Sequence, residues 1–242
     1  MSPDAPIDLL VVAAHPDDEI ATFGAIIPHS LALGRSVAVA CLTRQADMEV
    51  AALREAELRA CLQACGLQRE PVLGSFPDCG FIAPGRFESL AWVWERWGGR
   101  AAAQDYIASL YRRFRPQVVF SHHPETGEYG HPNHMAAGWA CVDAWDALHA
   151  AGDPATPCKI YARSDAPDAW HPDWHAPQPA FDGRSAAEIG AAALRCHRSQ
   201  SCADAGIRPH LRYRILRSRV GDDLVRDDIL EHCPPTEASC AS

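Results

Sequence analysis

A histidine and three carboxylates fall within five residues in the stretch Ala14-His15-Pro16-Asp17-Asp18-Glu19. His15 offers a neutral nitrogen and Asp18 a carboxylate oxygen, and both kinds of atom suit Zn²⁺. Asp17 lies between them in sequence, so we expect it to stay off the metal and to accept a proton from water there. The alternative interpretation is a capped helix start, in which the acids favour the positive end of the helix dipole.

A second group of ligand-type residues follows in the stretch Gly127-Glu128-Tyr129-Gly130-His131-Pro132-Asn133-His134. Pro132 is typical of the entry into a helix. We therefore expect His134 to project from the start of that helix into a crevice, while His131 lies on the preceding turn. Gly127 and Gly130 in the same stretch let the backbone approach a ligand closely.

Each group follows a short apolar run, Leu9–Ala13 in the first case and Gln117–Phe120 in the second. Such runs are typical of buried parallel strands. Carboxyl ends of parallel strands meet at one edge of a sheet, where open α/β folds bind their ligands. His134 can therefore join His15 and Asp18 in a His₂-carboxylate set that leaves one position open for water.

The rest of the chain alternates between strand and helix patterns, which predicts a single α/β domain. The expected strands are Asp8–Ala13, Val37–Leu42, Pro71–Phe76, Gln117–Phe120, Lys159–Ala162 and Arg212–Arg219. The expected helices are Ala21–Leu33, Glu49–Cys65, Ala101–Phe114, Met135–Leu148 and Ser185–His197. In the second of these, Leu53, Leu58 and Leu62 are expected on one apolar face.

Two segments rich in proline and glycine, residues 77–99 and 165–179, interrupt this alternation as loop insertions near the pocket. The first holds Trp92, Trp94 and Trp97, which either pin the loop to the domain or stack on a sugar ring. The second is expected to be a loop or lid rather than another metal site. We expect one domain over residues 1–232 and a flexible tail over residues 233–242.

Composition narrows the classes of function. A chain of 242 residues with 48% hydrophobic residues suits one globular domain. The net charge of −9 argues against nucleic acid and acidic membranes as partners. No apolar run reaches membrane-spanning length and no signal peptide is evident, so a cytoplasmic location is expected. The ten cysteines are scattered without a CxxC pair, which indicates reduced residues.

Taken together, the two chemical stretches resemble the LmbE-like (PIG-L) family of zinc deacetylases. The segment Gly34 through Thr43 resembles the second strand of that family, and Arg195–Gln200 resembles its C-terminal helix, which ends in a His-x-Ser-Gln pattern. The resemblance implies a Rossmann-like, three-layer α/β/α fold with a mostly parallel sheet. It also implies removal of an acyl group, typically acetyl, from the amino group of a glucosamine-containing small molecule.

The resemblance assigns roles to residues as well. The residues that match the zinc ligands are His15, Asp18 and His134, and Fe²⁺ is an alternative ion for the same site. Asp17 matches the general base. His131 matches a histidine that assists the tetrahedral intermediate or the leaving group, and Tyr129 matches a tyrosine that polarises the scissile carbonyl.

This chain departs from the family pattern in two places. Arg44-Gln45 stands where many members have Gly-Glu, so the loop that faces the substrate is expected to bind something different. Asn133 stands where many members have aspartate, so the electrostatics near the metal are expected to differ. The residues expected to contact the substrate are Arg44, Asp78, Trp92, Trp94 and Trp97. Two alternatives stay open: a hydrolase of another amide, thiol-conjugate or ester bond, and a non-catalytic sugar-binding protein of the same fold.

Overall fold

A six-stranded sheet with the order β3-β2-β1-β6-β7-β8 forms the centre of the molecule. The computed structural model describes residues 5–164, 169, 173–202 and 211–219. The strands are β1 Leu9–Ala13, β2 Val37–Arg44, β3 Val72–Pro77, β6 Val118–Ser121, β7 Lys159–Ser164 and β8 Arg212–Ser218. The first five strands in the sheet order pair in parallel, and β8 pairs antiparallel at the edge. The expected mostly parallel α/β fold is confirmed.

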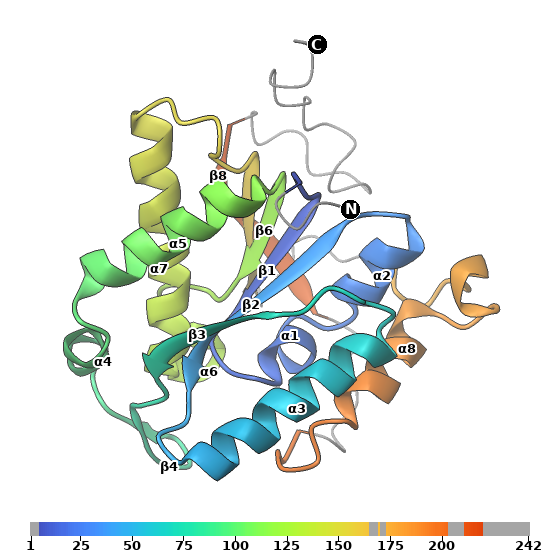
Figure 1. Ribbon diagram of the computed structural model, residues 1–242, viewed down its shortest axis with the longest axis horizontal. Helices are drawn as coiled ribbons and strands as arrows, with labels where there is room; N and C mark the ends of the chain where they lie inside the picture. The colour runs from blue at the N-terminus through green and yellow to red at the C-terminus, as the bar shows by residue number, and fades with distance from the viewer. Residues whose placement is uncertain (1–4, 165–168, 170–172, 203–210, 220–242) are drawn as a thin grey trace.

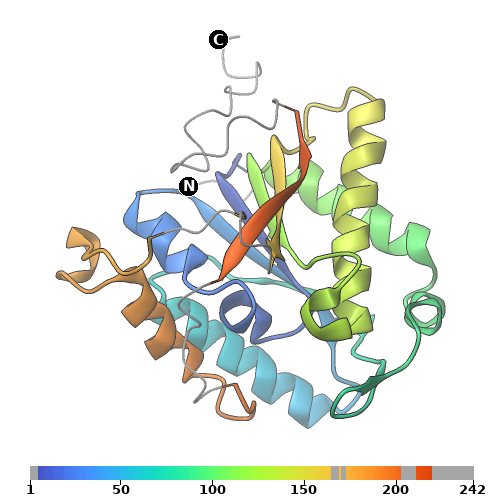
Figure 2. The ribbon, with the colours of Figure 1, turned by 180° about the vertical axis from the view of Figure 1, so that it is seen from behind.

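Apolar side chains of β1 serve both faces of the sheet. Leu9 and Val11 belong to one buried cluster and Leu10 and Val12 to the other, as the two-residue period of a strand requires. The helices on the first face are α1 Asp18–Ala21, α2 Ile26–Ala32, α3 Met48–Ala64 and α8 Ala186–Leu194. Those on the second face are α4 Leu90–Arg96, α5 Arg100–Phe114 and α7 Pro132–Ala150. The result is the expected three-layer arrangement (Figure 1 and Figure 2).

The strand order reverses direction at β1. The chain leaves β1 toward β2 and β3 on one side and later returns to β6 on the other side. Leu9 is in register with both Val37 of β2 and Val118 of β6. The carboxyl ends of β1 and β6 therefore lie next to each other at a topological switch point, which is where such sheets bind ligands.

The helix expected over residues 21–33 is two helices, α1 and α2, and this corrects the prediction. Gly24 lies in the break, with a φ of +59°. A Cβ atom added to Gly24 would lie 2.3 Å from Cζ3 of Trp174, whose side chain is buried. A continuing helix is excluded here for two reasons: the indole ring occupies the space that a side chain at position 24 would need, and Pro28 cannot donate the helical hydrogen bond to the Gly24 carbonyl.

Helix α3 matches its expected bounds within one residue, but its buried face differs from the prediction. Leu53, expected beside Leu58 and Leu62, is 50% exposed. Arg54 is buried instead. The helix is therefore turned so that a charged side chain points inward at the carboxyl edge of the sheet.

The insertion over residues 77–99 contains a β-hairpin followed by α4. The hairpin pairs β4, Phe81–Ala83, with β5, Arg86–Phe87. Trp97 is buried, stacks on Phe76 with ring centroids 4.7 Å apart, and donates its indole N–H to the Pro77 carbonyl. Trp94 packs edge-on against Trp97. These two rings pin the insertion to the domain.

Residues 165–168 and 170–172 lie outside the described residues, as does the segment 233–242. The expected lid over residues 165–179, the flexible tail and the domain limits therefore stay predictions. Within the part of the chain that the structure covers, no helix is both long enough and apolar enough to cross a bilayer.

Candidate active site

Three donor atoms converge where β1 and β6 end: Nδ1 of His15, Oδ2 of Asp18 and Nε2 of His134. The His15 and Asp18 atoms are 3.0 Å apart, those of Asp18 and His134 are 3.3 Å apart, and those of the two histidines are 3.2 Å apart. A tetrahedral ion with bonds of about 2.0–2.1 Å holds its donors about 3.3 Å apart. The triangle can therefore hold a metal ion the size of zinc with little rearrangement.

A partner orients each of the three donors. Glu128 Oε2 is 2.7 Å from Nδ1 of His134, and Asp78 Oδ1 is 3.3 Å from Nε2 of His15. A carboxylate behind a histidine fixes its ring and raises its basicity as a ligand. The Thr22 hydroxyl donates to the second oxygen of Asp18 at 2.9 Å. The set thus has the outer contacts that a metal centre needs.

Negative charge surrounds the two buried histidines. Burial lowers the pKa of His15, but the Asp78 and Asp18 carboxylates outweigh it and raise that pKa to about 10. Burial likewise lowers the pKa of His134, and Asp18 with Glu128 raises it to about 9. The surroundings therefore favour positive charge at this point, and a divalent cation supplies it while both rings stay neutral.

Asp17 lies beside the triangle and is held from several directions. Its backbone N–H donates to Glu19 Oε2 at 2.8 Å, and the Cys202 thiol donates to its Oδ2 at 3.4 Å. Arg54 Nη2 lies 3.8 Å from the other carboxylate oxygen. Burial, together with the Asp18 charge, raises the pKa of Asp17 to about 7. A carboxyl group with that pKa is matched to proton transfer near neutral pH.

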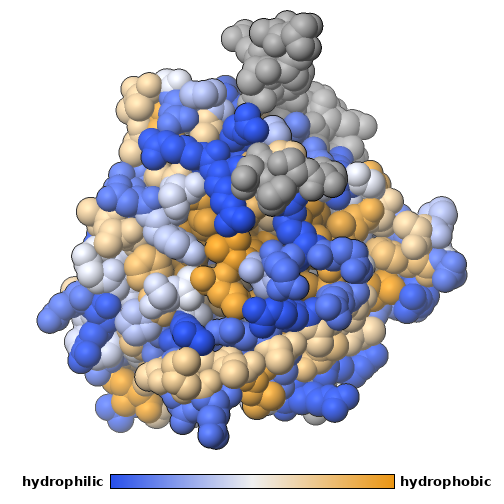
Figure 3. All heavy atoms as spheres, viewed as in Figure 1, coloured by the Kyte–Doolittle hydropathy of each residue, from blue (hydrophilic) through white to orange (hydrophobic). Residues whose placement is uncertain are grey.

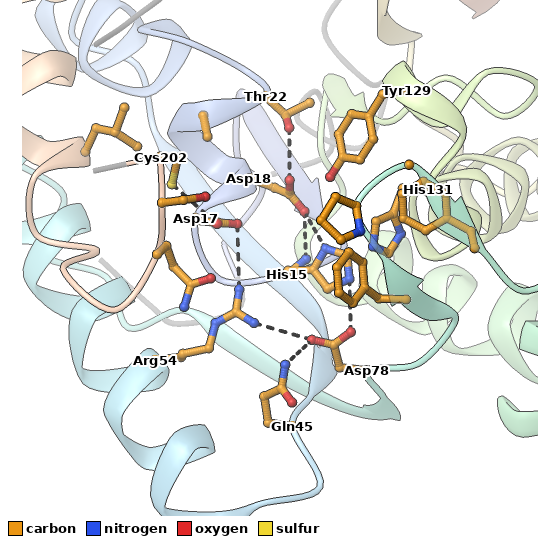
Figure 4. Close-up of a pocket in the computed structure, with 18 of the residues that line it drawn as sticks. His15, Asp17, Asp18, Thr22, Gln45, Arg54, Asp78, Tyr129, His131 and Cys202 are labelled. Atoms are coloured by element: carbon orange, nitrogen blue, oxygen red, sulfur yellow. Dashed lines mark hydrogen bonds and ion pairs between the residues drawn. The ribbon is translucent and has the colours of Figure 1, made fainter. Parts of the chain in front are cut away.

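His131 starts helix α7, and its Nδ1 accepts the N–H of Asn133 at 3.3 Å. A neutral ring with an accepting Nδ1 carries its hydrogen on Nε2, an assignment that rests on these partners. Burial, reinforced by His15 and His134, holds the pKa of His131 far below its usual value. Both His131 and the exposed Tyr129 line the cavity, and Figure 4 shows them on the side opposite Asp17.

Arg54 is a site residue that sequence reasoning missed. It donates to the Pro16 carbonyl at 2.7 Å and to Asp78 Oδ2 at 3.4 Å, beside the contact with Asp17 (Figure 4). Asp78 lines the cavity, so its expected contact with the substrate stays a prediction; it also lies behind His15 and accepts from the Gln45 amide. The available signal was an arginine inside the apolar stripe of a helix, where a charge needs partners.

The structure places the other expected substrate residues elsewhere. In the part of the chain that the structure describes, the cavity wall contains neither Arg44 nor the three tryptophans. Arg44 forms an ion pair with Glu55 at 3.0 Å, and Trp92 lies under the guanidinium of Arg96. The stacking role that was left open for the tryptophans therefore stays a prediction without a place in the cavity wall. The aromatic residues in the wall are Phe81, Phe87 and Tyr129.

A protein-family model described as "PIG-L: GlcNAc-PI de-N-acetylase" matches residues 10–145, more than half of the chain. The chain belongs to the PIG-L family. The matched span includes both chemical stretches, so the family resemblance seen in the motifs is confirmed. The three residues of the triangle, His15, Asp18 and His134, all lie within the span that the PIG-L family model matches.

Named relatives agree with the family, and a solved structure shares the fold. A 1D-myo-inositol 2-acetamido-2-deoxy-α-D-glucopyranoside deacetylase of Tsukamurella paurometabola is 30% identical, over 79% of this chain and 82% of that protein. One of Catenulispora acidiphila is 31% identical, over 64% of this chain, and the match spans about half of that protein, 52%. The N,N'-diacetylchitobiose deacetylase of Pyrococcus horikoshii has a TM-score of 0.57 at 17% identity, covering 89% and 84% of the two chains, which shows a shared fold.

Proposed function

We propose that this PIG-L protein is a metal-dependent hydrolase that removes an N-acetyl group from an amino sugar in a small molecule. The observation that carries the proposal is the triangle of His15, Asp18 and His134, with Asp17 beside it. Two imidazole nitrogens and one carboxylate suit zinc, which is the ion we propose. The names of the relatives support an acetylated amino sugar as the substrate.

Asp17 moves the proton in the proposed reaction. A zinc ion held by the triangle would supply a Lewis acid that lowers the pKa of water and polarises a carbonyl. The Asp17 carboxylate accepts the proton of the water that attacks the acyl carbon. Its pKa of about 7 lets the same group return that proton to the departing amine. Arg54 and Cys202 hold the carboxylate in place for both transfers.

His131 stabilises the oxygen on which negative charge develops. The ring lines the cavity and is a neutral donor through its Nε2–H, because Nδ1 accepts the backbone N–H of Asn133. A donor fixed before the reaction strengthens its hydrogen bond as the charge forms. Tyr129 adds a hydroxyl from the preceding turn on the same side of the cavity.

The test is to incubate the zinc-loaded protein with N-acetylglucosamine and its glycosides and to follow the products by mass spectrometry. We expect loss of one acetyl unit, release of acetate and a new primary amine. The Asp17→Asn protein serves as the inactive control. Cleavage of the glycosidic bond with the acetamide intact, or activity confined to other amides, thiol conjugates or esters, contradicts the proposal.

A further inference from the structure

An aromatic wall forms one side of the cavity at the site. The cavity has a volume of about 690 Å³, within the range of pockets that enclose drug-sized ligands. Phe81, Pro84 and Phe87 line it from the β4–β5 hairpin, and Tyr129 lines it from the turn before α7. Figure 4 shows Tyr129 across the cavity from the Asp17 carboxylate.

The rings form a continuous path from solvent to the reaction centre. The centroids of Phe81 and Phe87 are 6.1 Å apart, and Phe87 lies 4.9 Å from His131 and 6.0 Å from Tyr129. At the outer end Phe81 is 60% exposed, and Tyr129 is 64% exposed. Aromatic rings left in water at a cavity mouth mark a surface that a ligand covers.

The hairpin that carries these rings is anchored to the metal site. Gly80 precedes β4 with a φ of +92°, and a Cβ there would lie 2.8 Å from Cγ of Pro132. The backbone therefore packs directly on the start of α7, two residues before His134. The Gly80 carbonyl also accepts the N–H of Glu88, which closes the hairpin. The wall thus stands in a fixed relation to the reacting atoms.

Exposed apolar residues continue outward from this wall. The described part of the chain exposes few large hydrophobic residues. Apart from Leu33 and Tyr129, all of them lie on the hairpin or on the first turns of α3. Those on the hairpin and on α3 are Phe81, Ile82, Met48, Val50 and Leu53. Figure 3 shows orange apolar residues over the hairpin and over α3, between blue hydrophilic ones.

The opposite wall of the cavity is polar. Gln45, Arg54, Arg163 and Gln200 line it together with the Asp17 carboxylate. A ligand that fills the cavity therefore meets hydrogen-bonding groups on one side and rings on the other. A free sugar can stack the C–H face of its ring on one aromatic side chain of this wall, and it would leave the other rings uncovered.

We propose that the acceptor is an amino sugar that carries an apolar aglycone, aromatic or alkyl, and that Phe81, Phe87 and Tyr129 hold that aglycone. The inference rests on the proposed function for the identity of the sugar and adds the class of the attached group. The sugar lies toward the polar wall with its acetamide at the metal site. The bound aglycone extends from the sugar along the row of rings toward Ile82.

The affinity for glycosides is measured separately from acetate release. The aglycone proposal and the deacetylase proposal are thereby tested by different measurements. The probes are the methyl, phenyl and octyl glycosides of glucosamine, which lack the acetyl group, titrated by calorimetry into the zinc-loaded protein. We expect the phenyl and octyl compounds to bind about tenfold more tightly than the methyl compound. The Phe81→Ser variant should lose most of that gain, because it removes the outermost ring of the wall.

Leu33→Ser is the matched control, since Leu33 is also exposed but lies at the end of α2, outside the cavity wall. It should keep the full gain. Equal affinity for all three glycosides, or a gain that survives in Phe81→Ser, overturns the inference. Binding of the protein to phosphatidylcholine vesicles that Phe81→Ser abolishes, with no preference among the glycosides, also overturns it and makes the patch a lipid surface. Failure to release acetate from the acetylated compounds, with the aglycone preference intact, counts against the deacetylase proposal alone.

Discussion

The backbone N–H of Ala14 decides which of two neighbouring histidines, His122 or His134, is the metal ligand. The rings of His122 and His134 stack with centroids 4.0 Å apart, and both present Nδ1 to Glu128 Oε2, at 2.8 and 2.7 Å. The Ala14 N–H donates to Nε2 of His122 at 3.0 Å, so that lone pair is engaged. Nε2 of His134 instead faces His15. We therefore assign His134 as the ligand and His122 as the residue that buttresses it.

Replacement of His134 by alanine should remove the metal. The variant loses one corner of the triangle, so we expect it to retain little of the one equivalent of zinc that the parent protein binds. Elemental analysis after dialysis measures this. His149→Ala is the control, because His149 lies exposed on the same helix and its variant should keep the metal. Full metal retention in His134→Ala would refute the ligand assignment.

Replacement of Asp17 by asparagine should separate catalysis from metal binding. The amide cannot accept the proton, so kcat should fall by about 10²- to 10⁴-fold, the usual contribution of a positioned base. The metal content should stay near one ion per chain, because Asp17 lies outside the triangle. Steady-state kinetics and elemental analysis on the same preparation give both quantities. If the metal disappears together with the activity, Asp17 is a ligand instead.

At the scale of elements, periodicity predicted the strands and most helices to within a few residues, because apolar stripes follow the buried faces. It did not predict the break in the first helix. Ile20, Phe23 and Ile26 keep a helical spacing through the break because α1 and α2 pack on the same core. Trp174, about 150 residues away in sequence, fills the space beside Gly24. The local signals of the break are Gly24 itself and Pro28, which cannot donate a hydrogen bond to the carbonyl four residues before it.

Two glycines in left-handed conformations test this account. Gly34 has a φ of +74° with nothing within 4 Å of an added Cβ, whereas a Cβ on Gly24 meets Trp174. Gly34→Ala should lower the free energy of unfolding by about 1 kcal/mol, from backbone strain alone. Gly24→Ala should lower it by about 2–4 kcal/mol, because overpacking adds to the strain. Urea denaturation of both variants compares them, and equal losses would mean that the indole does not set the break.

At the scale of the whole molecule, the meeting of the two motifs was predictable and the return of the C-terminal segment was not. Parallel strands place their carboxyl ends at one edge, so His15 and His134 could be brought together from sequence alone. The contact of His197 Nε2 with Glu19 Oε1, at 2.6 Å, joins residues 178 positions apart. The His-x-Ser-Gln resemblance pointed to this segment but named no partner for it.

The His197–Glu19 pair should make stability depend on pH. Burial lowers the pKa of His197, but the Glu19 carboxylate outweighs it and the pKa is raised, with Asp17 and Glu57 contributing. The charged ring therefore stabilises the fold fully below pH about 6.5, its unfolded value, and the contribution is lost as the pH rises through the folded value. His197→Gln lacks this contribution. The difference in free energy of unfolding between parent and variant should shrink as the pH rises above about 6.5; urea titrations that give a constant difference would contradict the linkage.

Asp17 has a φ of 120°, a backbone conformation that glycine adopts with ease and other residues adopt at about 1–3 kcal/mol. Glu128, behind His134, also has a positive φ, of 62°. Glycine at position 17 would remove the strain there, whereas glycine at position 128 would also remove the carboxylate that contacts His122 and His134. An acid at each strained position points to a function for the carboxylates. A descendant of this chain that no longer needed turnover would be free to drift toward glycine at position 17, gaining stability as it lost its chemistry.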